Sequence, residues 1–210
     1  MNVLFVTDVH MSESALAWSR DAAARYDAVI VGGDLEMGGR SGFAARFLGE
    51  LLSSARAVYY VPGNADAPDI EIPDGVVKLH GRRKRIDRMT IGGLGGSNVT
   101  GMNTTFELQD SEARSILSSL GRVDILVSHC PPAKTKCDMA GGRHIGSLPV
   151  REYIEREDPA VVLSGHAHES RAIDRLGGTT VVNPGPLMEG KYAVLNLGAI
   201  VSVELKSGAF

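Results

Sequence analysis

The sequence predicts a mixed α/β protein in which two packed β-sheets lie between outer helices. Apolar runs of strand length alternate with helical segments in the first third of the chain, which indicates parallel strands joined by helical crossovers. After residue 75 the pattern changes to short strands separated by turn residues, which indicates a second, mixed sheet. Because each sheet must bury one face, two sheets packed together with helices outside are the simplest arrangement.

The first third of the chain contains three expected strands and two expected helices. The strands cover residues 3–6, 28–31 and 57–61. Ser12 is expected to cap the first helix, and apolar residues between positions 43 and 52 recur at the spacing of a second helix. Strands connected in this way run parallel, so their carboxyl ends meet at one edge of the sheet, where ligands bind in open α/β sheets.

The segment between residues 75 and 130 is expected to contain antiparallel strands, a loop and a helix. The glycines from Gly92 to Gly96 match neither a phosphate-binding loop nor a dinucleotide fingerprint, so we expect a flexible loop there. Asp110 is expected to cap the helix that follows. The expected strands cover residues 76–79, 85–91, 91–94 and 123–127.

The last third is expected to complete the second sheet. Ser147 is a predicted cap for a short helix that ends at Glu157, with Pro149 in its first turn. No linker or internal repeat divides the chain, so we expect a single domain over residues 1–210. The remaining expected strands lie near residues 160–163, 171–175, 179–182, 192–197 and 200–205.

Composition limits the function classes. A net charge of −3 and an aromatic content of 5% do not favour a nucleic-acid surface, and the basic cluster Arg82–Arg85 is interpreted as a solvated turn. No stretch reaches the apolar length of a membrane helix, and no signal-peptide pattern opens the sequence, so we expect a cytoplasmic protein with no membrane partner. In that reducing compartment Cys130 and Cys137 should be free thiols.

Polar residues follow five of the expected strands at their carboxyl ends. One histidine pair, such as the one in Gly165-His166-Ala167-His168, is a weak signal, and unrelated structural hydrogen bonds are the alternative. The shared position at strand ends favours one convergent site, and its donors suit two divalent ions of Mn, Fe, Co, Ni or Zn better than Mg or Ca. The candidate ligands are Asp8, His10, Asp34, Asn64, His129, His166 and His168.

These motifs, in this order and spacing, resemble the signature of the calcineurin-like metallophosphoesterases. Asn183-Pro184-Gly185 is similar to the small bacterial and archaeal phosphodiesterase branch. The resemblance implies a four-layer α/β/β/α sandwich with a dinuclear centre, in which manganese is the expected metal. By the same resemblance, one ion would bind Asp8, His10 and His168, the other would bind Asn64, His129 and His166, and Asp34 would bridge them.

The resemblance further implies a hydrolase acting on phosphate esters. A hydroxide held between the two ions would attack phosphorus, with Asn64 and His129 in the catalytic centre. Many family members carry a histidine after Gly-Asn that serves the leaving group, whereas this chain has Ala65, which favours phosphodiesters or activated esters. We expect His144 to be a substitute acid, and Asn98, Arg143 and His144 to contact a small phosphoester substrate.

Two alternatives come from other function classes. One is a scaffold of the same fold that binds a protein partner, and the complete ligand set argues against it. The other is a metallonuclease, which the absence of a basic face and of an aromatic stacking row does not favour. The natural substrate, the physiological metal and the oligomeric state do not follow from these residues.

Overall fold

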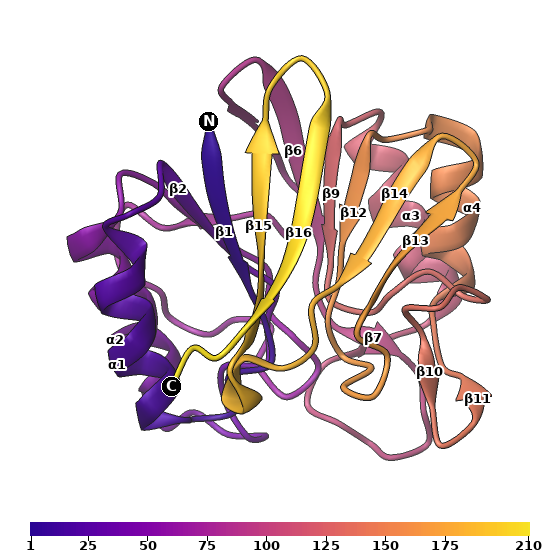
Figure 1. The fold of residues 1–210 in the computed structure, drawn as a ribbon. Helices are drawn as coiled ribbons and strands as arrows, with labels where there is room; N and C mark the ends of the chain where they lie inside the picture. Colours follow the sequence, from indigo (N-terminus) through magenta and orange to yellow (C-terminus); the bar gives the residue numbers. More distant parts are fainter.

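Two six-stranded mixed sheets pack face to face between two pairs of helices. This computed structural model describes residues 1–210 (Figure 1). Helices α1 (Glu13–Ala23) and α2 (Phe43–Ser54) cover the outer face of the first sheet, and α3 (Asp110–Leu120) and α4 (Leu148–Glu157) cover that of the second. The predicted two-sheet class and the four layers implied by the resemblance are both confirmed.

The first sheet has the strand order β16-β15-β1-β2-β3-β4. Strands β1, β2 and β3 are parallel, as predicted, so their carboxyl ends lie at one edge. Ser12 caps α1 as predicted, because its hydroxyl accepts a hydrogen bond from the Ala15 amide. The strands are β1 (Asn2–Val6), β2 (Ala28–Val31), β3 (Val58–Tyr60), β4 (Val77–Lys78), β15 (Lys191–Leu197) and β16 (Val201–Ser207).

Two predictions about this sheet are wrong. Strand β4 pairs parallel with β3, although residues 76–79 were expected to be antiparallel. Strands β15 and β16 were expected in the second sheet, but β15 pairs antiparallel with β1. The chain returns to the first sheet through the short 3₁₀ helix η1 (Leu187–Glu189), where the Leu187 amide donates to the Thr7 carbonyl at 2.8 Å. Residue alternation predicts a strand, but it does not identify the neighbour with which the strand pairs.

The second sheet has the strand order β13-β14-β12-β9-β6-β5. Strands β6, β9, β12 and β14 are parallel neighbours, and antiparallel strands β5 and β13 close the two edges. The strands are β5 (Arg83–Ile86), β6 (Met89–Leu94), β9 (Ile125–Ser128), β12 (Val161–Leu163), β13 (Ala172–Leu176) and β14 (Thr179–Asn183). Four short strands lie outside both sheets: β7 (Ser97–Asn98), β8 (Glu107–Leu108), β10 (Met139–Ala140) and β11 (Arg143–His144).

Three local predictions are corrected here. Gly92 and Gly93 belong to strand β6, as the strand expected over residues 91–94 requires, so the flexible loop expected from Gly92 onward is wrong for these two glycines. A Cβ on Gly93 would lie 2.5 Å from Cγ1 of Val61. A glycine at this position therefore permits the close approach of the two sheets. The basic cluster forms exposed strand β5 rather than a turn. Gln109, not Asp110, caps α3, in a reciprocal capping box with Glu112.

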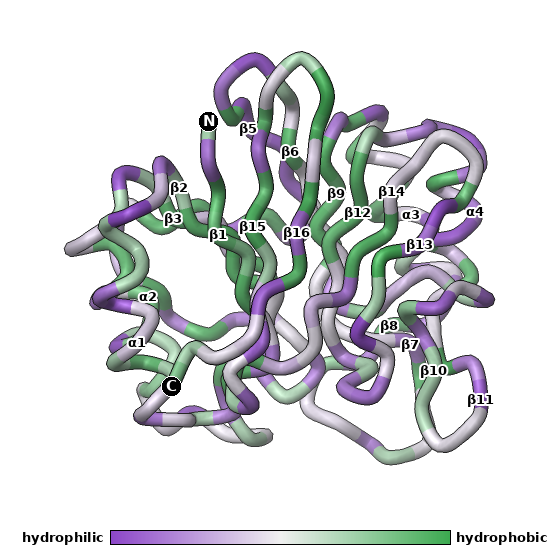
Figure 2. Tube along the Cα trace, in the orientation of Figure 1, coloured by the Kyte–Doolittle hydropathy of each residue, from purple (hydrophilic) through white to green (hydrophobic).

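The core is divided between three layers of apolar contact. A cluster of 17 buried residues fills the space between the sheets, and clusters of 22 and 12 residues lie beneath the two helix pairs. The central strands are correspondingly hydrophobic along their length (Figure 2). Burying a side chain such as Phe5 or Tyr60 contributes about 1.5–3 kcal/mol, so the strand ends are held firmly in place.

Among the helices, none combines the length and the apolar character that a membrane span requires.

Candidate metal centre

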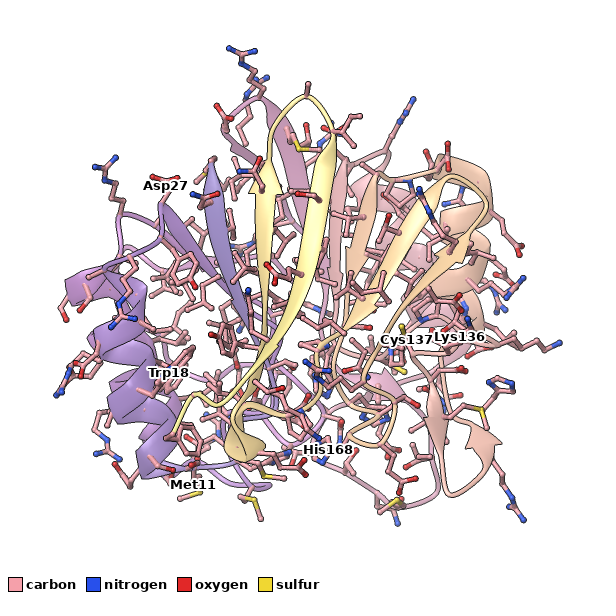
Figure 3. All side chains as sticks on the ribbon, viewed as in Figure 1. Met11, Trp18, Asp27, Lys136, Cys137 and His168 are labelled. Carbon is pink, nitrogen blue, oxygen red and sulfur yellow. The ribbon has the colours of Figure 1, made fainter.

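The candidate ligands gather at the edge of the sandwich where β1, β2, β3, β9 and β12 end. His168 is labelled at this edge in Figure 3. The backbone turns sharply there, since four of the candidates have left-handed conformations that non-glycine residues rarely adopt. Their φ angles are 55° at Asp8, 46° at His10, 52° at Asp34 and 65° at His166.

Three glycines allow the loops to touch. A Cβ on Gly33 would lie 2.4 Å from the Gly63 nitrogen, and one on Gly165 would lie 2.2 Å from Oγ1 of Thr7. These separations are shorter than any real side chain tolerates, so only glycine fits. The sequences Gly33-Asp34, Gly63-Asn64 and Gly165-His166 thereby bring their polar side chains together.

Asp8, His10 and His168 form one group of possible ligands. One nitrogen or oxygen from each lies within 4.8 Å of the others. The Nε2 atoms of His10 and His168 are 3.2 Å apart, and His168 Nε2 is 3.4 Å from Asp8 Oδ1. The His166 amide donates to both Asp8 oxygens at 3.1 and 3.2 Å, which orients that carboxylate.

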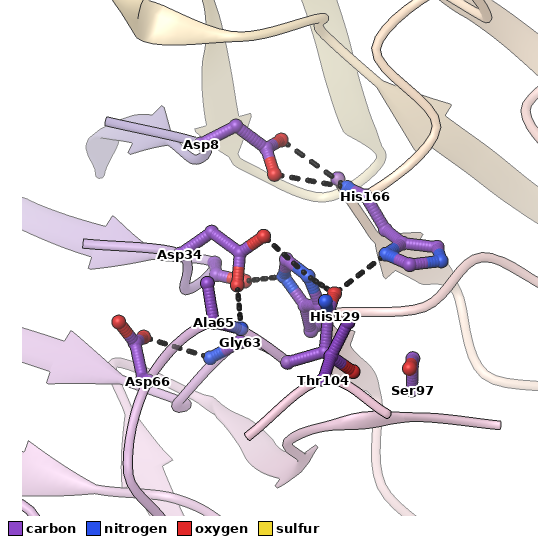
Figure 4. Close-up of polar contacts among 12 residues, drawn as sticks. Asp8, Asp34, Gly63, Ala65, Asp66, Ser97, Thr104, His129 and His166 are labelled. Atoms are coloured by element: carbon purple, nitrogen blue, oxygen red, sulfur yellow. Dashed lines mark hydrogen bonds and ion pairs between the residues drawn. The ribbon is translucent and has the colours of Figure 1, made fainter. Parts of the chain in front are cut away.

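Asn64, His129 and His166 meet beside this group. Figure 4 shows His129 and His166 close to Asp8 and Asp34. The Oδ1 atom of Asn64 lies 2.7 Å from His166 Nδ1 and 3.0 Å from His129 Nε2. Asp34 stands between the two groups, with its Oδ2 atom 3.4 Å from His129 Nε2 and 3.7 Å from His10 Nε2. The structure thus brings together all seven residues that the sequence singles out.

Further groups hold these side chains in place. Asp34 Oδ1 accepts a hydrogen bond from the Ala65 amide at 2.7 Å, and His129 Nδ1 donates to the Gly32 carbonyl at 2.8 Å. Asp66 is completely buried and accepts bonds from the amides of Leu35, Glu36 and Gly63 and from the Tyr60 hydroxyl. Its supporting role was not predicted, although the motif Gly63-Asn64-x-Asp66 contains it.

At Asp34 and His129, the attraction between opposite charges shifts the pKa more than burial does. Burial alone would raise the pKa of Asp34, but the charge of His129 lowers that pKa below its usual value. Burial alone would lower the pKa of His129, but Asp34 and Asp8 raise it to about 9. Burial and the positive charge of His129 lower the pKa of His166 to about 4. A positive charge is therefore favoured between the two aspartates.

The donor set fits divalent metal ions. His10 Nδ1 and His166 Nε2 are buried without a hydrogen-bond partner. Carboxylate, amide or imidazole atoms face Nδ1 of His166 and the Nε2 atoms of His10, His129 and His168. Such convergence of buried lone pairs is costly unless cations satisfy it. Mixed imidazole and carboxylate donors are those that transition ions prefer.

The three predicted substrate-contact residues lie outside this cluster. Asn98 accepts a hydrogen bond from the Cys130 thiol at 3.0 Å. Arg143 and His144 form the exposed strand β11, and His144 Nδ1 lies 2.7 Å from Oδ1 of buried Asp138. No hydrogen bond or ion pair connects these three residues with the seven candidate ligands. Their role in substrate binding, and that of His144 as an acid, stay predictions.

Known proteins resemble this chain over most of its length. The sequence model of the calcineurin-like phosphoesterase superfamily domain matches residues 1–206. An uncharacterised protein of Methanocaldococcus jannaschii is 33% identical over 198 residues, which cover 89% of this chain and 88% of that protein.

Solved structures share the fold. A protein of Thermus thermophilus superposes with a TM-score of 0.76 at 22% identity, and 98% of each chain is covered. A dimetal phosphatase from Danio rerio superposes with a TM-score of 0.66 at 12% identity, over 99% of this chain and 96% of that one.

Proposed function

Because this chain belongs to the calcineurin-like phosphoesterase superfamily, we propose that it hydrolyses phosphate esters with two divalent metal ions and prefers phosphodiesters. The observation that carries the proposal is the position of Asp34. Its Oδ2 atom faces His10 on one side and His129 on the other, at 3.7 and 3.4 Å. A carboxylate between two imidazole-rich groups suits a pair of cations better than a single one.

The two groups divide the ligands between the ions. Asp8, His10 and His168 would hold one ion, Asn64, His129 and His166 the other, and Asp34 would contact both. Manganese is the proposed metal, and Ni, Fe, Co and Zn suit the same donors. When bound, such ions lower the pKa of a water molecule and neutralise charge on the phosphate oxygens.

The chain itself orients these donors. The Gly32 carbonyl accepts the Nδ1 proton of His129, which leaves Nε2 directed at Asp34 and Asn64. The Ala65 amide fixes one oxygen of Asp34 and leaves the other toward His10 and His129. Groups that hold ligands in this way raise affinity because little reorganisation accompanies binding.

The preference for diesters rests on what stands next to Asn64. Ala65 has no proton to give, and the family resemblance places a histidine at this position in many members. An ester whose leaving group is a poor one needs a proton, so we propose phosphodiesters or activated esters as substrates and His144 as a substitute acid. A protein-binding scaffold would have no use for the seven converging donors, and a net charge of −3 gives little attraction for a nucleic acid.

Metal content and turnover test the proposal together. Protein freed of metal with a chelator should take up about two equivalents of Mn²⁺ and then hydrolyse bis-p-nitrophenyl phosphate. A panel of cyclic nucleotides, linear diesters and monoesters should show faster turnover of diesters than of monoesters. The absence of stoichiometric metal uptake would overturn the proposed function, and faster turnover of monoesters would overturn the diester preference alone.

A further inference from the structure

An uncharged groove opens beside the candidate metal centre. Its volume is about 390 Å³, and His10 and Ala65 line the part nearest to the candidate ligands. Residues 37–38 from the loop after β2 and residues 102–105 from the loop before β8 line the rest. Anything bound through a phosphate at the metal centre could therefore extend directly into this groove.

Hydrogen bonds fix both loops to the segment that carries Asn64. The Gly38 amide donates to the Ala65 carbonyl at 2.9 Å, and the Phe106 amide donates to the Asn64 carbonyl at 2.9 Å. A Cβ on Gly38 would lie 3.6 Å from Oγ1 of Thr105, so the two loops also meet each other. The groove is thus a built extension of the site.

The second loop is braced internally. The carboxylate of Glu107 accepts hydrogen bonds from the Thr104 amide and hydroxyl at 3.1 and 2.9 Å, and from the Thr100 hydroxyl at 2.7 Å. These bonds hold the turn on which Met102 sits. Because the turn is held, Met102 projects from a defined position rather than from a free loop.

Two methionines, one from each loop, line the groove. Met37 is 67% exposed and Met102 is 79% exposed, so both side chains are accessible to a bound ligand. The polar residues of the lining are Asn103, Thr104 and Thr105, besides His10, and no Lys, Arg, Asp or Glu contributes. Such a lining gives no countercharge to a second phosphate, but it does accept a neutral group with some polar edge.

We propose that the groove binds an uncharged aromatic ring on the ester arm of the substrate, in contact with Met37 and Met102. This inference rests on the proposed function and specifies its substrate class. A thioether is polarisable and flexible, so it makes favourable contacts with the edge and face of a flat ring. The hydroxyl and amide groups of Thr104, Thr105 and Asn103 can meet polar atoms on the rim of that ring, which an alkyl chain lacks.

Binding of simple phosphonates to the metal-loaded protein tests the inference without any turnover. Phenylphosphonate, cyclohexylphosphonate and methylphosphonate share one headgroup and differ only in the attached group. By calorimetry, phenylphosphonate should bind roughly tenfold more tightly than methylphosphonate and more tightly than cyclohexylphosphonate. The double variant Met37→Ser, Met102→Ser should lose this preference, whereas Ile200→Ser, which alters an exposed apolar residue in the β15–β16 turn, should retain it.

A spectroscopic measurement supplies an independent readout. With ¹³C-labelled methionine methyl groups in the diamagnetic zinc-loaded protein, phenylphosphonate should shift the signals of Met37 and Met102 through its ring current. The signal of Met89, at the start of β6, should stay in place. The single serine variants assign the two signals, since each removes one of the seven methionines.

The outcomes separate the two proposals. Equal affinity for the phenyl and cyclohexyl compounds, or an unchanged preference in the double variant, would overturn the aromatic groove while methylphosphonate binding left the proposed function standing. If no phosphonate binds and no phosphoester is hydrolysed, the proposed function and this inference both fail.

Discussion

The Nε2 atom of His129 lies 3.4 Å from Oδ2 of Asp34, and the two residues follow strands of different sheets. Asp34 follows β2 in the first sheet, and His129 comes immediately after β9 in the second. The contact therefore depends on the packing of the two sheets as well as on each loop. It also concentrates opposite charges, because each group shifts the pKa of the other toward its charged form.

Replacing Asp34 with asparagine should abolish metal-dependent turnover and leave the fold intact. Asparagine keeps the oxygen that accepts from the Ala65 amide, but it removes the negative charge between the two groups. We expect the loss to exceed the roughly 100-fold typical of changes to groups that only support a ligand. Hydrolysis of bis-p-nitrophenyl phosphate, bound metal and circular dichroism measure the three quantities.

Asp69→Asn is the matched control for this variant. Asp69 is an exposed aspartate in an ion pair with Arg40, away from the candidate ligands, so turnover should stay at the wild-type level. Retained manganese-dependent activity in Asp34→Asn would contradict the assignment of Asp34 to both ions.

The position of the candidate ligands that follow strands of the first sheet could be predicted from the sequence. The parallel order of β1, β2 and β3 follows from their alternation with helices, and it places Asp8, Asp34 and Asn64 at one edge. The same reasoning could not say that β15 pairs with β1, because strand pairing over long range depends on which edge is free when the chain returns.

The supporting contacts were beyond the reach of sequence patterns. The buried carboxylate of Asp66 accepts bonds from Leu35, Glu36 and Gly63, and none of these pairings has a periodic signature. At the glycines of β6, the loop expected from Gly92 onward overlapped the strand expected over residues 91–94, and the sequence could not decide between them. Glycine composition suggests a flexible backbone, whereas Val61, which follows β3 of the first sheet, packs against Gly93, and only the three-dimensional structure contains this contact.

Gly165→Ala should weaken metal binding at the group formed by Asp8, His10 and His168. The new Cβ would lie 2.4 Å from Asp8 Oδ2 and 2.2 Å from Thr7 Oγ1, so the Asp8 carboxylate must move. We expect at least about a tenfold loss of affinity for one of two manganese ions, measured by calorimetry. Gly39→Ala meets nothing within 4 Å and should bind as the wild type does. Two undisturbed sites in Gly165→Ala would argue against Asp8 as a ligand.

The stability of the metal-free protein should pass through a maximum near pH 6.5. The folded protein raises the pKa of His129 to about 9, so the stabilisation from its proton is complete below pH 6.5 and is lost as the pH rises to about 9. His166 acts in the opposite direction, because its pKa is lowered to about 4 and the unfolded chain gains protons first as the pH falls from 6.5.

Thermal unfolding of the chelator-treated protein measures both the alkaline limb and the acid limb of this curve of stability against pH. Between pH 6.5 and 9 the Tm should fall by roughly 5 to 10 °C. His129→Gln should flatten this alkaline limb, and the acid limb between pH 6.5 and 4 should remain. A Tm that rises steadily from pH 6.5 to 9 would show that His129 carries no extra proton in the folded protein.

His144→Ala should slow esters with basic leaving groups far more than p-nitrophenyl esters. His144 Nδ1 is engaged with Asp138, which orients the ring on the exposed β11 strand and leaves Nε2 free to give a proton. General acids contribute about 10²–10⁴ in rate when the leaving group needs a proton. The rates on alkyl and p-nitrophenyl diesters are compared for the wild type and for His144→Ala, and Asp69→Asn, at an exposed residue outside the site, serves again as the control. Equal effects on both esters would remove His144 from the chemistry.

Ala65→His should extend hydrolysis to esters with poor leaving groups. Ala65 lines the groove together with His10, and its amide already holds Asp34, so a histidine there would place an imidazole beside the candidate metal centre. We expect at least about a tenfold gain on phenyl phosphate and little change on p-nitrophenyl phosphate, because only the former leaving group requires the proton. Ala65→Gln is the matched variant, since it adds polar bulk without an ionisable ring and should give no gain. If Ala65→His also gives no gain on phenyl phosphate while manganese binding is retained, Ala65 is not what limits the substrate range.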